Sequence, residues 1–200
     1  MRHTSEVVLV GVVSLFALTG AVATALWDED AGSAHVTRVE SADFYEPGSV
    51  VGAAIWFRSV RQHCNPVEVR TTLRATPPPP TAEGDIHAAA CYALAGRVDH
   101  ARALIDGLPD QAHLHAAAVV FGAGHRAARA GDPLAAGPLM ELVVEFWPDH
   151  SQALYYAATA RLEAGDFPAA ERYFERFLDA HPTQDAWHIR ATEMLEEARG

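Results

Sequence analysis

The chain has 200 residues, 50% of them hydrophobic, which is enough apolar material for one folded domain with a buried core in addition to a membrane anchor. Its 26 acidic residues outnumber its 15 basic ones and give a formal charge of -11. Such a chain lacks the basic surface that binding to phosphates requires, so we exclude nucleic-acid binding. All the basic residues are arginine, which in an alanine-rich chain we attribute to codon usage rather than to selection at a site.

Residues 7–26 form a run of twenty residues without a charge. As a helix rising about 1.5 Å per residue, this run spans the roughly 30 Å hydrocarbon core of a bilayer. Arg2 precedes the run, and Trp27 and the acidic residues 28–30 follow it. This order of charges favours a cytoplasmic N-terminus and an exported C-terminal part. We therefore predict a single transmembrane anchor or uncleaved signal at 1–27, with the remaining chain on the periplasmic side of the cell membrane.

A cleaved signal peptide is the alternative to this anchor. The triplets 21–23 and 23–25 both have the small-x-small pattern that precedes a cleavage site. The apolar region of a cleaved signal is commonly about 7 to 15 residues long, which is shorter than the run found in this chain. We favour the anchor for that reason, and a protein secreted after cleavage stays open.

The middle of the chain changes from irregular to helical sequence. After a stretch without periodicity, apolar residues recur at helical spacing. Asn65, Pro66 and Glu68 then form a pattern that is typical of a helix start, with a capping residue, a proline at the first position and an acid three residues after the cap. Four prolines at 77–80 stop the helix. The predicted segments are a linker at 28–48, a helical hairpin at 49–75 and a proline-rich connector at 76–84.

Further along the chain, a pattern repeats with a period of 34 residues. Gly131 and Gly165 are each followed by aspartate, and Pro148 and Pro182 keep the same spacing. Gly96 lies 35 residues before Gly131, so the first unit is less regular. Between these positions, apolar residues recur as in two amphipathic helices joined by a turn. The predicted repeats lie within 85–183, at about 85–116, 117–150 and 151–184, and a capping helix follows at 185–200.

The third unit has the most complete set of residues at the repeat positions. These residues are Leu154, Ala157, Ala158, Ala170, Phe174 and Pro182. The pattern resembles the tetratricopeptide repeat, a helix-turn-helix module whose hairpins stack side by side. The resemblance implies an all-α fold, with an α-solenoid of helical hairpins and a capping helix after the predicted transmembrane helix. We expect the cap to bury Trp187, Ile189, Met194 and Leu195 on the last repeat.

The same resemblance implies a binding function, because the first helices of such units line a groove that holds a partner peptide or helix. We interpret the protein as a protein–protein interaction scaffold or an assembly or chaperone factor of the bacterial cell envelope. Two alternatives stay open: the middle segment fills the groove, or the protein is a structural subunit of a membrane complex. The predicted groove residues are Ile86, Ala90 and Leu94 in the first unit, Phe121, His125 and Arg129 in the second, and Tyr155, Thr159 and Glu163 in the third.

Cys64 and Cys91 are the only cysteines in the chain. An exported location permits a disulfide between them. Nothing in the sequence shows that they meet, so we slightly favour two buried free thiols. His63 and His87 lie near the cysteines in the sequence, and the four residues together have the ligand types of a zinc site. A metal- or redox-handling accessory protein is therefore the functional alternative, while the leading interpretation has no metal and no cofactor.

Sequence motifs of catalytic sites are missing from the chain. It contains no G-x-S-x-G, no H-E-x-x-H, no glycine-rich phosphate loop and no C-x-x-C. Most of the sequence after the connector is instead accounted for by the packing of helical repeats. We therefore expect a protein that is not an enzyme and has no catalytic residues.

Overall fold

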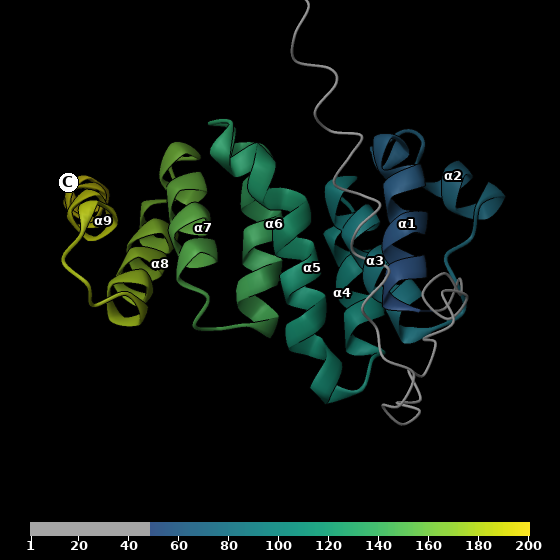
Figure 1. Cartoon of the computed structure of the whole chain (residues 1–200). Helices are drawn as coiled ribbons and strands as arrows, with labels where there is room; N and C mark the ends of the chain where they lie inside the picture. Colours follow the sequence, from purple (N-terminus) through teal and green to yellow (C-terminus); the bar gives the residue numbers. More distant parts are fainter. Residues whose placement is uncertain (1–48) are drawn as a thin grey trace, which may run out of the picture. The chain divides into compact units, whose positions relative to one another are not determined.

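The computed structural model describes residues 49–200, and the regular elements in this range are all helices (Figure 1). The predicted all-α fold is confirmed for this part of the chain. The predicted anchor at 1–27 and linker at 28–48 lie outside the described residues. Among the helices that the structure describes, none combines the length and the apolar character that crossing a bilayer requires. The transmembrane helix therefore stays a prediction from the sequence.

The repeat region consists of helical hairpins that lie side by side in chain order (Figure 1). The hairpins are α3 (Ala82–Leu94) with α4 (Val98–Asp106), α5 (Asp110–Arg129) with α6 (Pro133–Phe146), and α7 (Ser151–Glu163) with α8 (Phe167–Ala180). The last helix, α9 (Ala186–Arg199), packs on α8. The second hairpin begins at Asp110 rather than near Ala117, because the residues directly after Pro109 already continue into the helix.

Glycine followed by a polar or charged residue forms the turn inside each hairpin. Gly96, Gly131 and Gly165 have φ angles of 69°, 79° and 73°, in the left-handed region where a side chain is disfavoured. In two hairpins the following aspartate starts the next helix. The side chains of Asp132 and Asp166 accept hydrogen bonds of 3.1 Å and 3.3 Å from the backbone N–H three residues on. The Gly-Asp pair thus ends one helix and begins the next, which explains why it marks the period of the repeat.

Glycine also lets neighbouring helices approach each other closely. A Cβ atom added to Gly137 of α6 would lie 2.5 Å from the Cβ of Ala160 in α7. A Cβ on Gly124 of α5 would lie 2.9 Å from a side-chain carbon of Leu139 in α6. These close approaches join the hairpins into one continuous apolar core that runs from α3 to α9.

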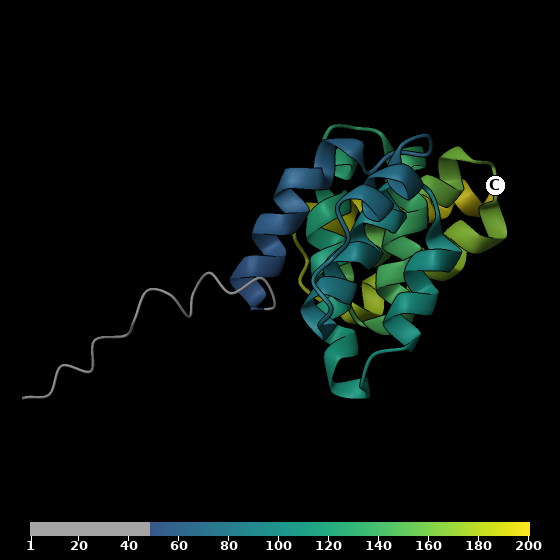
Figure 2. The ribbon, with the colours of Figure 1, turned by 90° about the vertical axis from the view of Figure 1, so that its right-hand side faces the viewer.

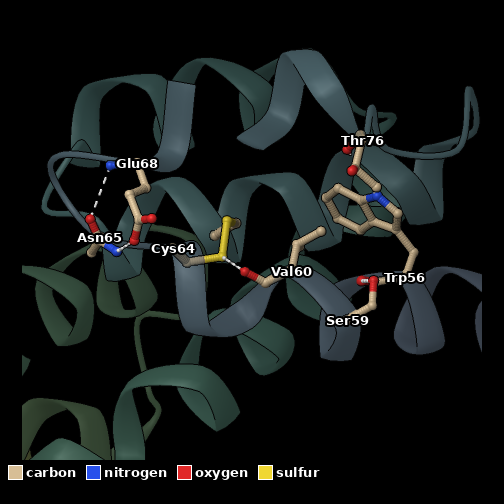
Figure 3. Close-up of a disulfide and its surroundings, with 8 residues drawn as sticks. Trp56, Ser59, Val60, Cys64, Asn65, Glu68 and Thr76 are labelled. Atoms are coloured by element: carbon tan, nitrogen blue, oxygen red, sulfur yellow. Dashed lines mark hydrogen bonds between the residues drawn. A yellow bond between two sulfur atoms is a disulfide. The ribbon is translucent and has the colours of Figure 1, made fainter. Parts of the chain in front are cut away.

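The segment before the repeats forms two helices, α1 (Val50–Val60) and α2 (Val69–Ala75). Helix α1 packs mainly on α3 and shares a small apolar cluster with α2, and Figure 2 shows α1 on one side of the hairpins. A short 3₁₀ turn, η2 (Arg61–His63), follows α1 and leads to a disulfide between Cys64 and Cys91 of α3 (Figure 3). The Cα atoms of the two cysteines are 4.9 Å apart. The apolar cluster around the disulfide includes Val60, Val69, Leu73 and Ala95.

The predicted capping residue Asn65 forms a turn ahead of α2 (Figure 3). Its side-chain oxygen accepts a hydrogen bond of 3.0 Å from the backbone N–H of Glu68, and its amide donates one of 2.7 Å to the Glu68 carboxylate. These are contacts of the predicted helix-capping pattern, in which Asn65 accepts from the N–H three residues on. The regular helix begins at Val69, three residues after the predicted start at Pro66.

The capping helix α9 covers the last repeat with two of the four predicted residues, Met194 and Leu195, together with Ala191. Ala191, Met194 and Leu195 are buried, at the i, i+3 and i+4 spacing of one helical face. Ile189 is 56% exposed, so the prediction that it is buried is wrong. Two positions before Ala191, it points about 200° away from the buried face. Trp187 is also partly exposed and lies against the rings of α7.

The close approach of α6 and α7 predicts opposite effects for two glycine-to-alanine substitutions. We expect Gly137→Ala to lower the free energy of unfolding by about 1–3 kcal/mol, because the new methyl overlaps Ala160. Gly122→Ala is the matched control: Gly122 is exposed in α5 with no atom near its Cβ position, and the change should raise stability by about 0.5–1 kcal/mol. Denaturant titrations of both variants measure the difference. Equal effects of the two substitutions would show that the α6–α7 approach is not limiting.

Candidate functional site

The predicted groove residues of the second repeat lie along one face of α5. Phe121, His125 and Arg129 are four residues apart and line an open hollow together with Arg126. The rings of Phe121 and His125 are 4.8 Å apart between centroids. The side chains of Phe121 and His125 are half-buried, and those of Arg126 and Arg129 are exposed. This face of α5 thus combines an aromatic surface with positive charge.

Ring contacts continue from α5 across α7 to α9. The His125 ring meets Tyr156 edge-on at 5.7 Å, and Tyr156 meets Trp187 at 6.0 Å. Tyr155 also lies edge-on to Trp187, at 4.8 Å. We call Phe121, His125, Tyr156, Tyr155 and Trp187 the aromatic row. It connects three helices that are far apart in the sequence through rings in contact.

Burial shapes the chemistry of the two tyrosines in the aromatic row. It raises the pKa of the Tyr155 and Tyr156 phenols, so both remain protonated at neutral pH. The Tyr155 hydroxyl lies 3.7 Å from the sulfur of Met194, a weak acceptor. The tyrosines therefore offer the row neutral hydroxyl donors rather than negative charge.

The other predicted groove residues have different surroundings. Thr159 donates a hydrogen bond of 3.0 Å to the backbone carbonyl of Tyr155, one turn earlier in the same helix. Glu163 is exposed at the C-terminal end of α7. In the first repeat, Ile86 and Ala90 are fully buried, so their prediction as groove residues is wrong. Helix α1 covers this part of α3, which matches the alternative that the middle segment lies over the first helices, but only for the first repeat.

Arginines near the aromatic row form a feature that the sequence did not reveal. Arg61, from η2, donates a hydrogen bond of 3.2 Å to the backbone carbonyl of Ala123 in α5, within one turn of Arg126. No ion pair with a carboxylate is found for Arg61, Arg126 or Arg129 among residues 49–200. We call these three arginines the basic cluster. Arg61 was missed because its contact with α5 joins residues 62 positions apart, outside any repeat spacing.

A second hollow lies next to the aromatic row, between the starts of α7 and α9. Its lining includes Trp147, His150, His181 and Trp187. The His150 ring lies 4.2 Å from that of Phe121 and 4.6 Å from that of Trp147. Burial lowers the pKa of His150, and the nearby His125 acts in the same direction. The aromatic surface therefore extends beyond the predicted groove to the loop between α6 and α7.

The disulfide decides between the interpretations of the cysteines. Both sulfur atoms are bonded to each other, which contradicts the favoured interpretation of two free thiols. A zinc site formed by His63, Cys64, His87 and Cys91 is wrong for the same reason, because zinc binds thiolates. Within residues 49–200, no group of three or more histidine, cysteine, aspartate or glutamate side chains is arranged to hold a metal ion. The cysteines instead attach the segment that carries Arg61 to α3.

Residues 127–195 match the sequence profile of a family described as Tetratricopeptide repeat. This part of the chain is therefore a tetratricopeptide-repeat region. The match runs from the end of α5 to α9 and contains the whole third repeat. Comparisons with curated proteins and with solved structures find no match. Tetratricopeptide repeats generally serve as non-catalytic scaffolds for protein–protein interaction, and their first helices form the binding surface. In this chain, the surface formed by the first helices α5 and α7 carries most of the aromatic row.

The position of His150 predicts a pH dependence of stability. Its Nδ1 accepts a hydrogen bond of 3.3 Å from the Ala153 N–H at the start of α7, which requires an unprotonated nitrogen. Because the pKa is lower in the folded than in the unfolded state, the unfolded state takes up the proton first as the pH falls. Stability is therefore lost from about pH 6.5, the usual histidine pKa, down to the folded-state pKa.

The variant His150→Asn keeps a capping acceptor and removes the titrating group. We expect the wild-type protein to lose more unfolding free energy than this variant between pH 7.5 and pH 5.5, measured by denaturant titration at each pH. The same loss in both proteins would mean that the charge of His150 does not influence folding.

Proposed function

We propose that the protein is an interaction scaffold of the bacterial cell envelope that assists the assembly of another envelope protein. In this proposal, the aromatic row holds apolar side chains of a partner segment, and the arginines beside it bind the polar groups of that segment. The observation that carries the proposal is the continuous row of rings from Phe121 to Trp187, which spans the first helices of two repeats and the cap and in which every ring except the buried Tyr156 is partly exposed. Large rings held in place by neighbouring rings lose little conformational entropy on binding, and such residues dominate binding energy in many interfaces.

The location in the envelope has two sources of support. The uncharged run at 7–26 is long enough for a membrane anchor, as argued from the sequence. The Cys64–Cys91 disulfide fits an oxidising compartment, because thiols are kept reduced in the cytosol. An anchored protein with its repeats in the periplasm agrees with both, and so does a protein secreted after signal cleavage. The disulfide leaves no thiolate for metal handling, so we do not extend the proposal to that function.

Photo-crosslinking in cells tests this proposal. A benzoylphenylalanine placed at Phe121 or at Tyr155 should form a covalent adduct with a partner, because both side chains lie in the aromatic row. Mass spectrometry of the adduct should identify an envelope protein. Matched control positions are Leu134 on α6 and Phe167 on α8, which are large exposed apolar residues on the second helices. We expect no adduct at these two positions.

Two outcomes would count against the proposed function. Adducts of equal yield at all four positions would show that the aromatic row is not the binding surface. A partner found only in the cytoplasm would contradict the location in the envelope. Adducts that form at Phe121 and Tyr155 with one protein of a stable membrane complex would identify the chain as a subunit of that complex.

A further inference from the structure

The basic cluster is unusual because it lies in a strongly acidic chain. The protein carries a formal charge of -11, yet residues 49–81 contain four arginines and only one glutamate. That glutamate, Glu68, is engaged by Asn65 and His63. Arg61 from this segment binds the Ala123 carbonyl of α5, and Arg126 and Arg129 follow Ala123 along the same helix, so arginines from two separate parts of the chain lie along α5. The charge is not balanced by carboxylates of residues 49–200, and it favours an acidic occupant.

Aromatic and imidazole side chains lie beside the arginines of α5. Phe121 and Gly122 line the hollow beside the two arginines of α5, so it offers an aromatic surface next to positive charge. Nδ1 of His125 is buried with no hydrogen-bond partner. A ligand can therefore form a hydrogen bond with this ring at Nε2. A fitting occupant carries carboxylates and aromatic side chains close together in sequence.

Residues 40–46 of the same chain have this composition. The sequence there is ESADFYE, with three acidic residues, no basic residue and the aromatic pair Phe44 and Tyr45. The segment lies outside the described residues, and it ends three residues before Ser49, the capping residue of α1. It is therefore an acidic and aromatic sequence in the same chain as a basic and aromatic surface.

The length of the connecting chain allows this segment to reach the basic cluster. From Ser49 to Arg61 the chain advances about 18 Å at 1.5 Å per helical residue. Asp43 and Glu40 precede Ser49 by six and nine residues, and extended chain of that length spans up to about 20 to 30 Å. The segment is thus long enough for both carboxylates to reach Arg61. Attachment in the same chain gives a local concentration on the order of millimolar, so even a weak interaction is populated.

We infer that residues 40–46 bind the basic cluster and the adjoining end of the aromatic row, and that they act as an internal occupant that a partner must displace. The inference rests on the proposed function in taking this surface as the partner site. It adds a form of regulation, because a partner segment must compete with residues 40–46 for this surface. The apparent affinity for the partner then falls in proportion to the fraction of molecules in which residues 40–46 occupy the surface.

A binding experiment with the full chain, purified in detergent, tests the inference. The probe is a fluorescein-labelled peptide with the sequence of residues 38–48, followed by fluorescence anisotropy. In the wild-type protein the internal segment should block the site. In the variant Glu40→Gln, Asp43→Asn, Glu46→Gln, the site should be free, and the peptide should bind at least about tenfold more tightly. Adding Arg126→Gln and Arg129→Gln to that variant should abolish the gain.

A matched control changes the same number of charges elsewhere in the chain. The variant Asp28→Asn, Glu29→Gln, Asp30→Asn should bind the peptide as weakly as the wild type. Circular dichroism checks folding, which the arginine substitutions should not disturb, because both side chains are exposed and lack ion pairs within residues 49–200.

Three results would overturn the inference: equal peptide affinity of wild type and the neutralised variant, binding that persists without the two arginines, or no binding to any variant. None of them removes the proposed function, which depends on the adducts at Phe121 and Tyr155. If those adducts form while the peptide fails to bind, the surface serves a partner but is not covered by residues 40–46. If the adducts are absent and the peptide binds as expected, the proposed function fails and the internal contact stands.

Discussion

Close approach of helices at small residues is the constraint on which the rest of this structure depends. Gly137 faces Ala160 across the junction of two repeats, and Gly124 faces Leu139 within a repeat, at distances that leave no room for a further methyl group. These contacts set the spacing of α5, α6 and α7. That spacing in turn determines whether the rings of α5 and α7 touch, because a ring contact is lost when two helices separate by a few ångströms. The aromatic row is thus a consequence of the close packing of the same helices.

The segment that contains α1, η2 and α2 is attached to the repeats by a different interaction, a disulfide. It precedes the repeats and has its own small apolar cluster, and the Cys64–Cys91 disulfide links it to α3. Closing a loop between positions 27 residues apart stabilises a fold by roughly 3 kcal/mol in the chain-entropy view. The attachment also places Arg61 against Ala123, so a covalent bond at α3 helps to define the charge of the surface on α5. The surface that we assign to binding is therefore composed of two parts that are stabilised independently.

Features that depend on local sequence were predictable, and features that depend on distant contacts were not. Gly131 and Gly165 were recognisable as turns because a left-handed backbone selects glycine regardless of its surroundings. The repeated apolar spacing similarly identified the hairpins. Ile189 was assigned to the wrong face because the helical phase of α9 is set by Ala191, Met194 and Leu195, and alanine gives a weak signal in an alanine-rich chain. The contact of Arg61 with α5 and the packing of α1 on α3 were not predictable, because the repeat pattern does not show which helix α1 packs against.

Hydrogen–deuterium exchange of the full chain, with the disulfide intact and after reduction, tests most directly whether the binding surface has these two independently stabilised parts. If the disulfide holds the N-terminal segment on a self-sufficient repeat array, reduction should speed amide exchange in α1 and η2 and leave α6, α7 and α8 unchanged. Unchanged exchange in α1, or faster exchange that spreads through α7 and α8, would contradict this description.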